Sequence, residues 1–348
     1  MGAVRRCSSP PIWLLAALVL ASACAPKPQL ISGGETMDPH LATLDLVSAA
    51  AQTRFVTLVR SPADVVRTRL LVKSLRAFGG PMRDCPFWVF IPKVVDLSCD
   101  FPDLGEVECV SLDMEEKFLR YILGDKVFVC AQAEEMAGPD VRTLIWISTD
   151  ALIVQPPVHF LLSGPLESAF RAVHVQNIGS LASEPLDGYW SEIYRRLGMK
   201  DTSLTVESFV DEQRIRPYYN SHLFSVDPAQ GLMQAWRDHF KAFVDDDEFQ
   251  TAHCADVTHQ IFLHQAVLSA LLTRGFNPER MRVLPPEYSY PLHFQGDIPE
   301  PKVARTLNEL VVPVYEQLCP RPDKLDDPKV EEPLASWLLE HVPVWGEE

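Results

Sequence analysis

Hydrophobic residues in the first half of the chain alternate between short unbroken runs and stretches with a helical period. The short runs are rich in β-branched and aromatic residues, which predicts buried strands. These predicted strands cover residues 55–59, 87–91, 107–110 and 144–147. Between them, residues 63–78 and 114–136 have helical spacing, and a Gly-Gly or Gly-Pro pair ends each stretch. Strands alternating with helices predict an α/β domain with a mostly parallel, Rossmann-like mixed sheet flanked by helices.

The second half of the chain is less regular but contains the same kinds of element. Helical patterns cover residues 187–198, 229–244 and 258–274, and a strand pattern covers residues 218–226. Residues 285–291 predict a rigid aromatic loop because Pro residues flank two tyrosines. From residue 315 the chain is rich in Pro and acidic residues, with one short helical pattern at 334–341. We therefore expect a single domain over residues 46–314 and a C-terminal tail over residues 315–348.

The N-terminal segment has the pattern of a targeting signal. Arg5 and Arg6 precede an apolar run over residues 12–23, which is shorter than the roughly 20 residues that span a bilayer. The run ends in Ala-Ser-Ala, so residues 1–23 are predicted to be a signal peptide. Cys24 follows directly and completes a sequence that resembles a bacterial lipobox. Either Cys24 carries a lipid, or the segment is an ordinary cleaved signal or a short anchor.

This N-terminus predicts that the protein is exported. A lipid on Cys24 would tether the domain to a membrane, as in a bacterial lipoprotein. In a eukaryotic secretory pathway the same segment would place the domain in the lumen. Residues 24–45 are polar and contain Pro and Gly, so we interpret them as a linker.

The composition is that of a globular protein with a negatively charged surface. Hydrophobic residues make up 47% of the 348 positions, and 47 acidic against 31 basic residues give a formal charge of −16. Such a surface repels phosphate backbones, so we expect no nucleic-acid partner. The cysteines after residue 24 allow up to three disulfides in an exported protein, or buried thiols. They are Cys85, Cys99, Cys109, Cys130, Cys254 and Cys319.

Several common catalytic motifs are missing from the sequence. It contains no GxG, no P-loop and no GxSxG, which argues against dinucleotide binding, Walker-type nucleotide binding and a serine-hydrolase elbow. His253, His259 and His264 are spaced by six and five residues, which does not put them on one helical face. We interpret these histidines as ordinary helix and loop residues. Because parallel sheets bind ligands at the carboxyl ends of their strands, attention falls on residues 60–61 and 148–150.

Residues 144–157 carry the most informative motif. An apolar strand runs into Ser148-Thr149-Asp150, and a second apolar run and a Pro pair follow. This segment resembles the one around the DxD motif of nucleotide-diphospho-sugar transferases with the GT-A fold. In such enzymes, strand-end carboxylates hold a divalent cation that neutralises the leaving diphosphate. Here Ser148 stands in place of the first Asp, and the alternative is that Asp150 only caps a turn.

Other segments follow in the order that this family has, from about residue 53 to residue 295. Residues 219–226 resemble its aromatic-Asn-Ser-Gly strand, with His222 in place of Gly. Residues 258–263 resemble its Asp-Gln helix start, with His259 in place of Asp. Residues 284–293 resemble a late loop that ends in a ligand histidine, here His293. The resemblance implies a divergent GT-A-like glycosyltransferase that uses Mn2+ or Mg2+.

The resemblance also implies a role for each matching residue. Asp150, helped by Ser148 and His293, would hold the cation on the donor diphosphate. The donor, a UDP-sugar among the candidates, would contact Arg60, Ser61, Lys126, Asn220 and Ser221. The catalytic residues would be Gln260, near the anomeric carbon, and Asn220, on the sugar hydroxyls. A glycan or other hydroxyl acceptor would dock over Tyr288 and Tyr290.

Three changed positions keep a second function open. Ser148, His222 and His259 replace expected Asp or Gly residues, as in a family member that has lost catalysis. Such a protein would be an inactive GT-A-like module that binds a glycan or a protein partner. A third candidate, a periplasmic solute-binding lipoprotein, would need two similar α/β halves, and the second half does not repeat the first.

Overall fold

The computed structural model describes residues 29–31, 41, 44–97 and 99–343. The predicted signal peptide over residues 1–23 and the lipidation candidate Cys24 lie outside these residues. In the part that is described, none of the helices has the length and apolar character needed to cross a membrane.

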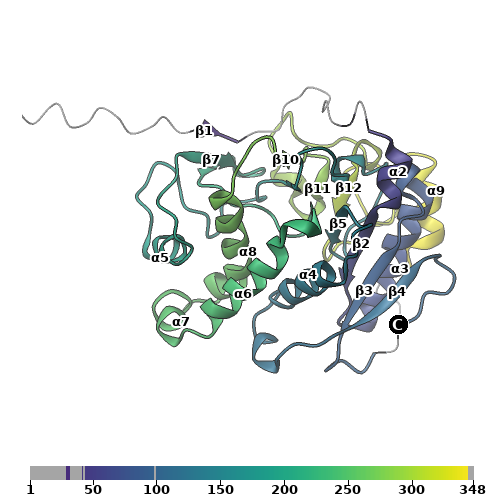
Figure 1. The fold of residues 1–348 in the computed structure, drawn as a ribbon. Helices are drawn as coiled ribbons and strands as arrows, with labels where there is room; N and C mark the ends of the chain where they lie inside the picture. Colours follow the sequence, from purple (N-terminus) through teal and green to yellow (C-terminus); the bar gives the residue numbers. More distant parts are fainter. Residues whose placement is uncertain (1–28, 32–40, 42–43, 98, 344–348) are drawn as a thin grey trace, which may run out of the picture.

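A seven-stranded sheet forms the centre of the molecule (Figure 1). Its strand order is β10-β6-β9-β5-β2-β3-β4. The strands are β2 (Thr53–Leu58), β3 (Phe87–Pro92), β4 (Val107–Leu112), β5 (Thr143–Ile147), β6 (Ser168–Phe170), β9 (Leu223–Val226) and β10 (Met281–Val283). Only β9 runs antiparallel to its neighbours β5 and β6, and the other pairs are parallel. The predicted mostly parallel α/β sheet is therefore confirmed.

Helices cover both faces of this sheet (Figure 1). One face carries α2 (Leu46–Ala51) and α3 (Pro62–Phe78). The other carries α4 (Asp125–Met136), α6 (Leu232–Val244) and α8 (Val257–Arg274), with α5 (Gly188–Arg196) and α7 (Asp247–His253) farther out. Because side chains alternate along a strand, Phe55 packs into the core on the α3 side and Val56 into the core on the α4 side.

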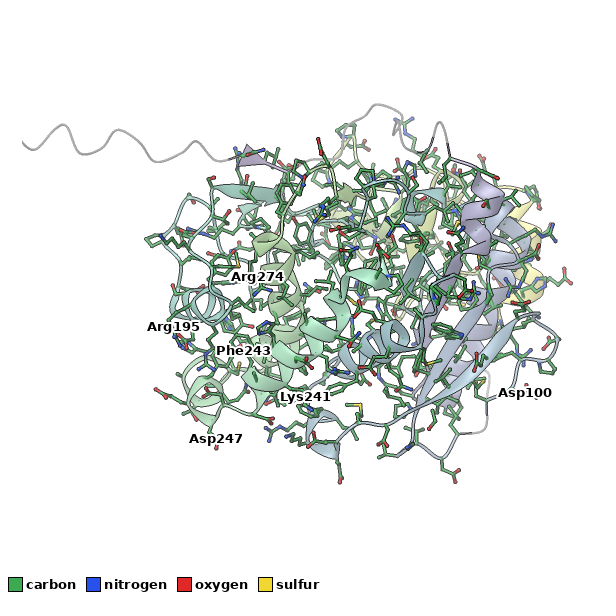
Figure 2. The ribbon with its side chains drawn as sticks, in the orientation of Figure 1. Asp100, Arg195, Lys241, Phe243, Asp247 and Arg274 are labelled. Carbon is green, nitrogen blue, oxygen red and sulfur yellow. The ribbon has the colours of Figure 1, made fainter. Side chains whose placement is uncertain are left out.

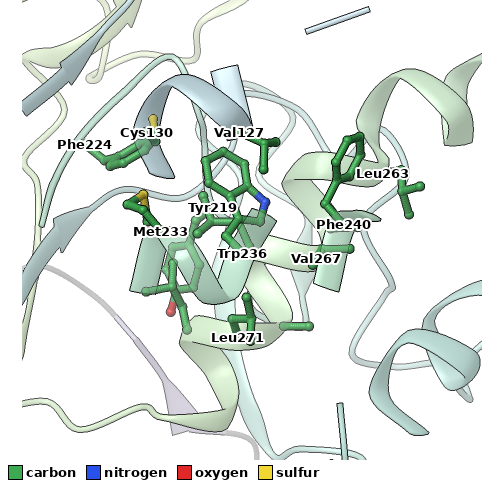
Figure 3. Close-up of a cluster of buried hydrophobic side chains, with 14 of the residues drawn as sticks. Val127, Cys130, Tyr219, Phe224, Met233, Trp236, Phe240, Leu263, Val267 and Leu271 are labelled. Atoms are coloured by element: carbon green, nitrogen blue, oxygen red, sulfur yellow. The ribbon is translucent and has the colours of Figure 1, made fainter. Parts of the chain in front are cut away.

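The core on the α4 side centres on aromatic side chains of α6. Trp236 lies between β9 and α8, close to Phe224, Phe240 and Val267 (Figure 3). Its ring is fully buried, and its Nε1 donates to the backbone oxygen of His264 at 2.7 Å. Charged side chains such as Arg195, Lys241 and Asp247 lie on α5, α6 and α7 (Figure 2). Packing at Trp236 thus fixes the middle of α8 against the sheet.

Some predicted elements are shorter than their hydrophobic patterns. Only residues 125–136 of the predicted helix 114–136 form α4, and a 3₁₀ turn, Glu116–Phe118, precedes it. Leu123, at φ 65°, interrupts the earlier part because a left-handed residue cannot continue an α-helix. Gly231, at φ 66°, delays the start of α6 from residue 229 to Leu232 in the same way. The predicted strand 218–226 is ordered as β9 only from Leu223.

Two segments that we expected to be a loop and a tail belong to the domain. Residues 285–291 are not an exposed loop, because Tyr288–Pro291 form β11, which pairs with β12 (Val312–Val314). The segment after residue 315 is not a tail. Tyr315, Leu334 and Leu338 are buried in a third hydrophobic cluster, and α9 (Leu334–His341) forms where the pattern predicted a helix. The folded domain therefore continues through most of this segment.

Two further predictions at the margins of the fold also have outcomes. Part of the predicted linker is ordered, since β1 (Gln29–Leu30) pairs with β7 (Leu204–Glu207), which also pairs with β8 (Arg214–Ile215). The six cysteines after residue 24 are free, and Cys85, Cys130 and Cys254 are buried thiols.

Candidate functional site

Polar side chains gather where β2 and β5 end and β9 begins. Because β9 runs antiparallel to β5, the segment before β9 lies at the carboxyl end of β5. The backbone N–H of Ser148 donates to the backbone oxygen of His222 at 3.0 Å, which joins the two segments. The predicted donor and cation residues Asp150, Asn220 and Ser221 therefore lie at one edge of the sheet, as expected for parallel sheets.

Asp150 has an oxygen that no other group satisfies. Its Oδ1 atom is buried and has no hydrogen-bond partner, whereas its backbone oxygen accepts from the N–H of Tyr315 at 2.9 Å. The Nδ1 atom of His293 is also buried without a partner. Burying a polar atom without a hydrogen bond is costly, so both atoms are available to a further group at this edge of the sheet. The alternative role for Asp150, a turn cap made by its carboxylate, leaves Oδ1 unexplained.

Glu316 lies between two imidazoles beside Asp150. Its Oε1 atom is 3.6 Å from Nε2 of His222 and 3.4 Å from Nε2 of His293. Burial, and then the charge of Asp150, raise the pKa of Glu316. Burial lowers the pKa of His222 to about 4 and also lowers that of His293, so both imidazoles are neutral at pH 7. The cluster of Asp150, Glu316, His222 and His293 therefore combines two carboxyl groups with two imidazoles.

Asn220 is buried next to this cluster and fixes the position of the His222 backbone and ring. Its Oδ1 accepts from the N–H of His222 at 2.7 Å and lies 3.1 Å from Nδ1 of the same residue. Its amide nitrogen is 3.0 Å from Nε2 of His174, whose ring stacks on His222 at 5.7 Å between centroids. Asn220 is thus an orienting residue in this arrangement, because its polar atoms are used within the protein.

Lys126 provides a buried positive charge at the same edge. The side chain is 4% exposed, and its Nζ lies 3.2 Å from the backbone oxygen and 3.3 Å from the Oγ of Ser221. Burial, and then the charge of Arg60, lower its pKa to about 8. Arg60 binds both carboxylate oxygens of Asp125, the residue before Lys126. Two cations thus lie close to the end of β2.

The structure places the remaining predicted residues away from these side chains or inside the core. Ser61 caps α3 by accepting from the N–H of Asp64 at 3.2 Å. Gln260 is on the first turn of α8, whereas α8 reaches Ser221 through His264 and Gln265, at 3.2 and 2.9 Å. Our interpretation of His264 as an ordinary histidine missed this contact.

The two tyrosines predicted to bind the acceptor are core residues. Tyr288 and Tyr290 are 0% and 1% exposed. The hydroxyl of Tyr288 accepts from the N–H of His159 at 3.0 Å, and that of Tyr290 donates to Gln295 at 2.7 Å. Because their rings and hydroxyls are used inside the protein, an acceptor cannot dock on them, and this prediction is wrong. The cause is the pairing of β11 with β12, which buries the expected loop.

Sequence reasoning also missed Glu316 and His174. Glu316 lies in a segment whose Pro and acidic residues predicted a tail, and His174 lies in an irregular stretch between β6 and β7. The only local signal of both residues is that each is a polar residue beside apolar ones, which is too common to identify a site. Their places depend on contacts between distant parts of the chain.

The arrangement fits a cation that arrives together with a phosphate ligand. Within the part of the chain that the structure describes, no three or more His, Cys, Asp or Glu side chains are already grouped to hold a metal ion. Mg2+ is usually bound by one or two carboxylates together with substrate phosphates, and not by a complete protein cage. The unsatisfied Oδ1 of Asp150 provides one such carboxylate.

Comparison with known families adds an independent observation. Residues 57–275, more than half of the chain, match the family model described as the Rhodobacterales glycosyltransferase domain. The mixed α/β fold with its seven-stranded sheet is consistent with the GT-A-like fold. No curated protein matches the chain. The matched residues include Arg60, Lys126 and Asp150 but end before His293 and Glu316.

Proposed function

Because the chain belongs to the Rhodobacterales glycosyltransferase domain family, we propose that it transfers a sugar from a nucleotide-diphosphate sugar to a hydroxyl acceptor. A UDP-sugar is the proposed donor, and a glycan or another hydroxyl compound is the proposed acceptor. The proposal rests above all on Asp150, whose buried Oδ1 lacks a partner at the carboxyl edge of the sheet.

Asp150 is the proposed ligand of Mn2+ or Mg2+, with Ser148 and His293 as candidate helpers. When bound, such a cation neutralises the charge that develops on the leaving diphosphate. The support for His293 is its own unsatisfied Nδ1 atom. Ser148 would contribute a hydroxyl from the same turn as Asp150. It is the weaker of the two helpers because no unsatisfied atom supports it.

The positive charges at this edge suit the diphosphate of the donor. Lys126 is buried beside Ser221 and feels the charge of Asp150, so an anionic ligand would stabilise its protonated form. Arg60 is held by Asp125, with 38% of its side chain exposed. Asn220 and Ser221 then orient the groups around the donor, because their polar atoms already bind His222 and Lys126.

A thermal-shift experiment tests this proposal. The protein would be heated with UDP, GDP and their sugars, each with Mn2+, Mg2+ or EDTA. A ligand at 100 times its dissociation constant stabilises a protein by about 2.7 kcal/mol, which the assay resolves. We expect a cation-dependent shift with one nucleotide that Asp150→Asn abolishes.

The matched control is Asp84→Asn. The Asp84 side chain is 88% exposed and lies just before β3, at the opposite end of the strands from Asp150, so this variant removes a carboxylate far from the proposed ligand. It should keep the full shift. If neither cation gives a shift with any nucleotide in the unchanged protein, the proposed donor site is wrong.

An inactive module that binds a glycan or a partner protein is the second candidate. The observation in its favour is that the first strand-end carboxylate is missing at Ser148, and that His259 is occupied by its helix cap Asp256 at 2.6 Å. Glycan binding that persists in EDTA and needs no nucleotide would support this candidate over the first.

A further inference from the structure

Glu316 reaches the site through backbone pairing between distant parts of the chain. The segment that follows β5 runs antiparallel to β12, with a bridge between Ala151 and Val314. The N–H of Leu152 donates to the oxygen of Pro313 at 3.0 Å, and the N–H of Tyr315 to the oxygen of Asp150 at 2.9 Å. This register places Glu316 opposite the turn that carries Ser148 and Asp150. The position of its carboxylate is therefore set by the sheet.

The backbone of Glu316 is held in an unusual conformation. Its φ of 46° lies in the left-handed region, which a residue with a side chain rarely adopts. Ser289, whose oxygen lies 2.7 Å from Nε2 of His174, has a φ of 52°. Such conformations cost free energy and are found preferentially at functional sites. The strain at Glu316 is therefore consistent with a requirement for its side chain at this place.

We infer that Glu316 is the second carboxylate of the proposed cation site and takes the place that Ser148 leaves without one. This inference rests on the proposed function. Asp150 and Glu316 together supply the one or two carboxylates with which proteins bind Mg2+ beside substrate phosphates. The Nε2 atoms of His222 and His293 lie 3.6 and 3.4 Å from the Glu316 carboxylate, so both imidazoles belong to the surroundings of the proposed site.

The contacts of the cluster support this role over a purely structural one. The Glu316 carboxylate lies beside two imidazoles, at 3.6 and 3.4 Å, and Oδ1 of Asp150 is buried without a partner. A divalent cation from solution, bound by both carboxylates, would satisfy Oδ1 of Asp150.

The test measures Mn2+ affinity by electron paramagnetic resonance in the full-length chain, with saturating UDP, and measures UDP binding in EDTA separately. Glu316→Gln keeps the size of the side chain and removes the charge. We expect at least a tenfold loss of Mn2+ affinity and unchanged binding of UDP in EDTA. Glu316→Asp keeps a carboxylate on a shorter side chain, so its Mn2+ affinity should lie between those of the unchanged protein and Glu316→Gln. If Glu316→Gln folds poorly, this variant still shows whether the carboxylate matters.

A gain-of-function variant sharpens the test. If Glu316 stands in for the missing strand-end carboxylate, Ser148→Asp should restore at least part of the Mn2+ affinity in Glu316→Gln. The control Glu331→Gln removes an exposed carboxylate from the same C-terminal segment and should leave Mn2+ affinity unchanged.

The outcomes separate the two proposals. If Asp150→Asn loses Mn2+ but Glu316→Gln binds it as tightly as the unchanged protein does, the inference about Glu316 is overturned and the donor site stands. If the unchanged protein shows no Mn2+-dependent binding of any nucleotide, the proposed donor site and this inference both fall.

Discussion

The two ends of the central strands are both rich in charge, but among the described carboxylates the one with a buried, unpartnered oxygen lies at the carboxyl end. At the amino end of β5, Arg142 pairs with Asp227 and also donates to the backbone oxygens of Gly164 and Leu166. Nearby, the carboxylate of Glu134 accepts from two N–H groups at the start of α6. At the carboxyl end, the Oδ1 of Asp150 has no partner. Of the carboxylates that the structure describes, only this one has a buried oxygen in that state.

The difference separates charges that are paired within the fold from a carboxylate oxygen that has no partner within it. The amino end also has a cavity, but the charged side chains that line it are paired within the protein. A cavity of about 280 Å³ lies there between α6, α8 and the starts of β6 and β10. Of its two arginines, Arg280 pairs with Glu167 at 3.1 Å, and Arg274 donates to the oxygen of Leu197 at 3.2 Å. The arginines beside this cavity are therefore already engaged within the protein, in contrast to Oδ1 of Asp150.

The largest expected effect is at the amino end. Asp227→Ala leaves Arg142 unpaired and also removes the acceptor for the N–H of Ala229 and the amide of Gln230. The side chain of Asp227 is 3% exposed and that of Arg142 is 30% exposed, so water compensates only part of the loss. We expect the free energy of unfolding, measured with urea, to fall by about 2–3 kcal/mol. Asp84→Ala, at an exposed pair, should change it by less than about 0.5 kcal/mol.

The comparison would be broken if Asp227→Ala also changed ligand binding. Measured at a temperature where the variant is folded, its affinity for UDP with Mn2+ should equal that of the unchanged protein. A loss of affinity without a loss of stability would assign Asp227 to the site and not to the fold.

The next largest effect is expected at the carboxyl end, where a variant should weaken ligand binding without lowering the free energy of unfolding. Lys126→Met removes a buried charge whose pKa burial has lowered, and it keeps a side chain of similar length. We expect about tenfold weaker UDP binding by calorimetry, because a positive charge beside the diphosphate is lost. The free energy of unfolding at pH 7 should stay the same or rise by about 1 kcal/mol, because the desolvated charge is gone. A large loss of stability would instead make Lys126 a structural residue.

The fold was predictable where a local pattern reports burial on both faces of a strand. The runs at residues 55–59 and 144–147 are apolar throughout because helices cover both sides of the sheet. The C-terminal segment has no unbroken apolar run of this kind. Its buried residues are separated in sequence by Pro and acidic residues that resemble those of a tail, and they pack against distant parts of the chain, as Tyr315, Leu334 and Leu338 do.

The site was predictable to the same extent and for a related reason. Asp150 follows β5, and Asn220 and Ser221 precede β9, so the antiparallel pairing of β5 with β9 brings all three to one edge. Glu316 depends on pairing between segments about 160 residues apart, for which no local spacing is informative. Tyr288 and Tyr290 fail for the converse reason, since a sequence rich in Pro and Tyr does not show that a strand will bury it.

The smallest expected effect on donor binding is a pH dependence that comes from Lys126, which also makes stability depend on pH. Its pKa is lowered from 10.5 to about 8, first by burial and then by Arg60. Between these values the unfolded chain carries the proton and the folded chain does not, so this residue makes stability rise as pH increases from about 8 to 10.5. Donor binding has the opposite trend, because the diphosphate prefers the protonated lysine, and affinity should fall a few-fold between pH 7 and 9. His222, with a pKa of about 4, does not titrate in this range. Since ionisation of UDP affects both proteins equally, the difference between the pH profiles of the unchanged protein and Lys126→Met isolates the lysine, and parallel profiles would remove it from the donor site.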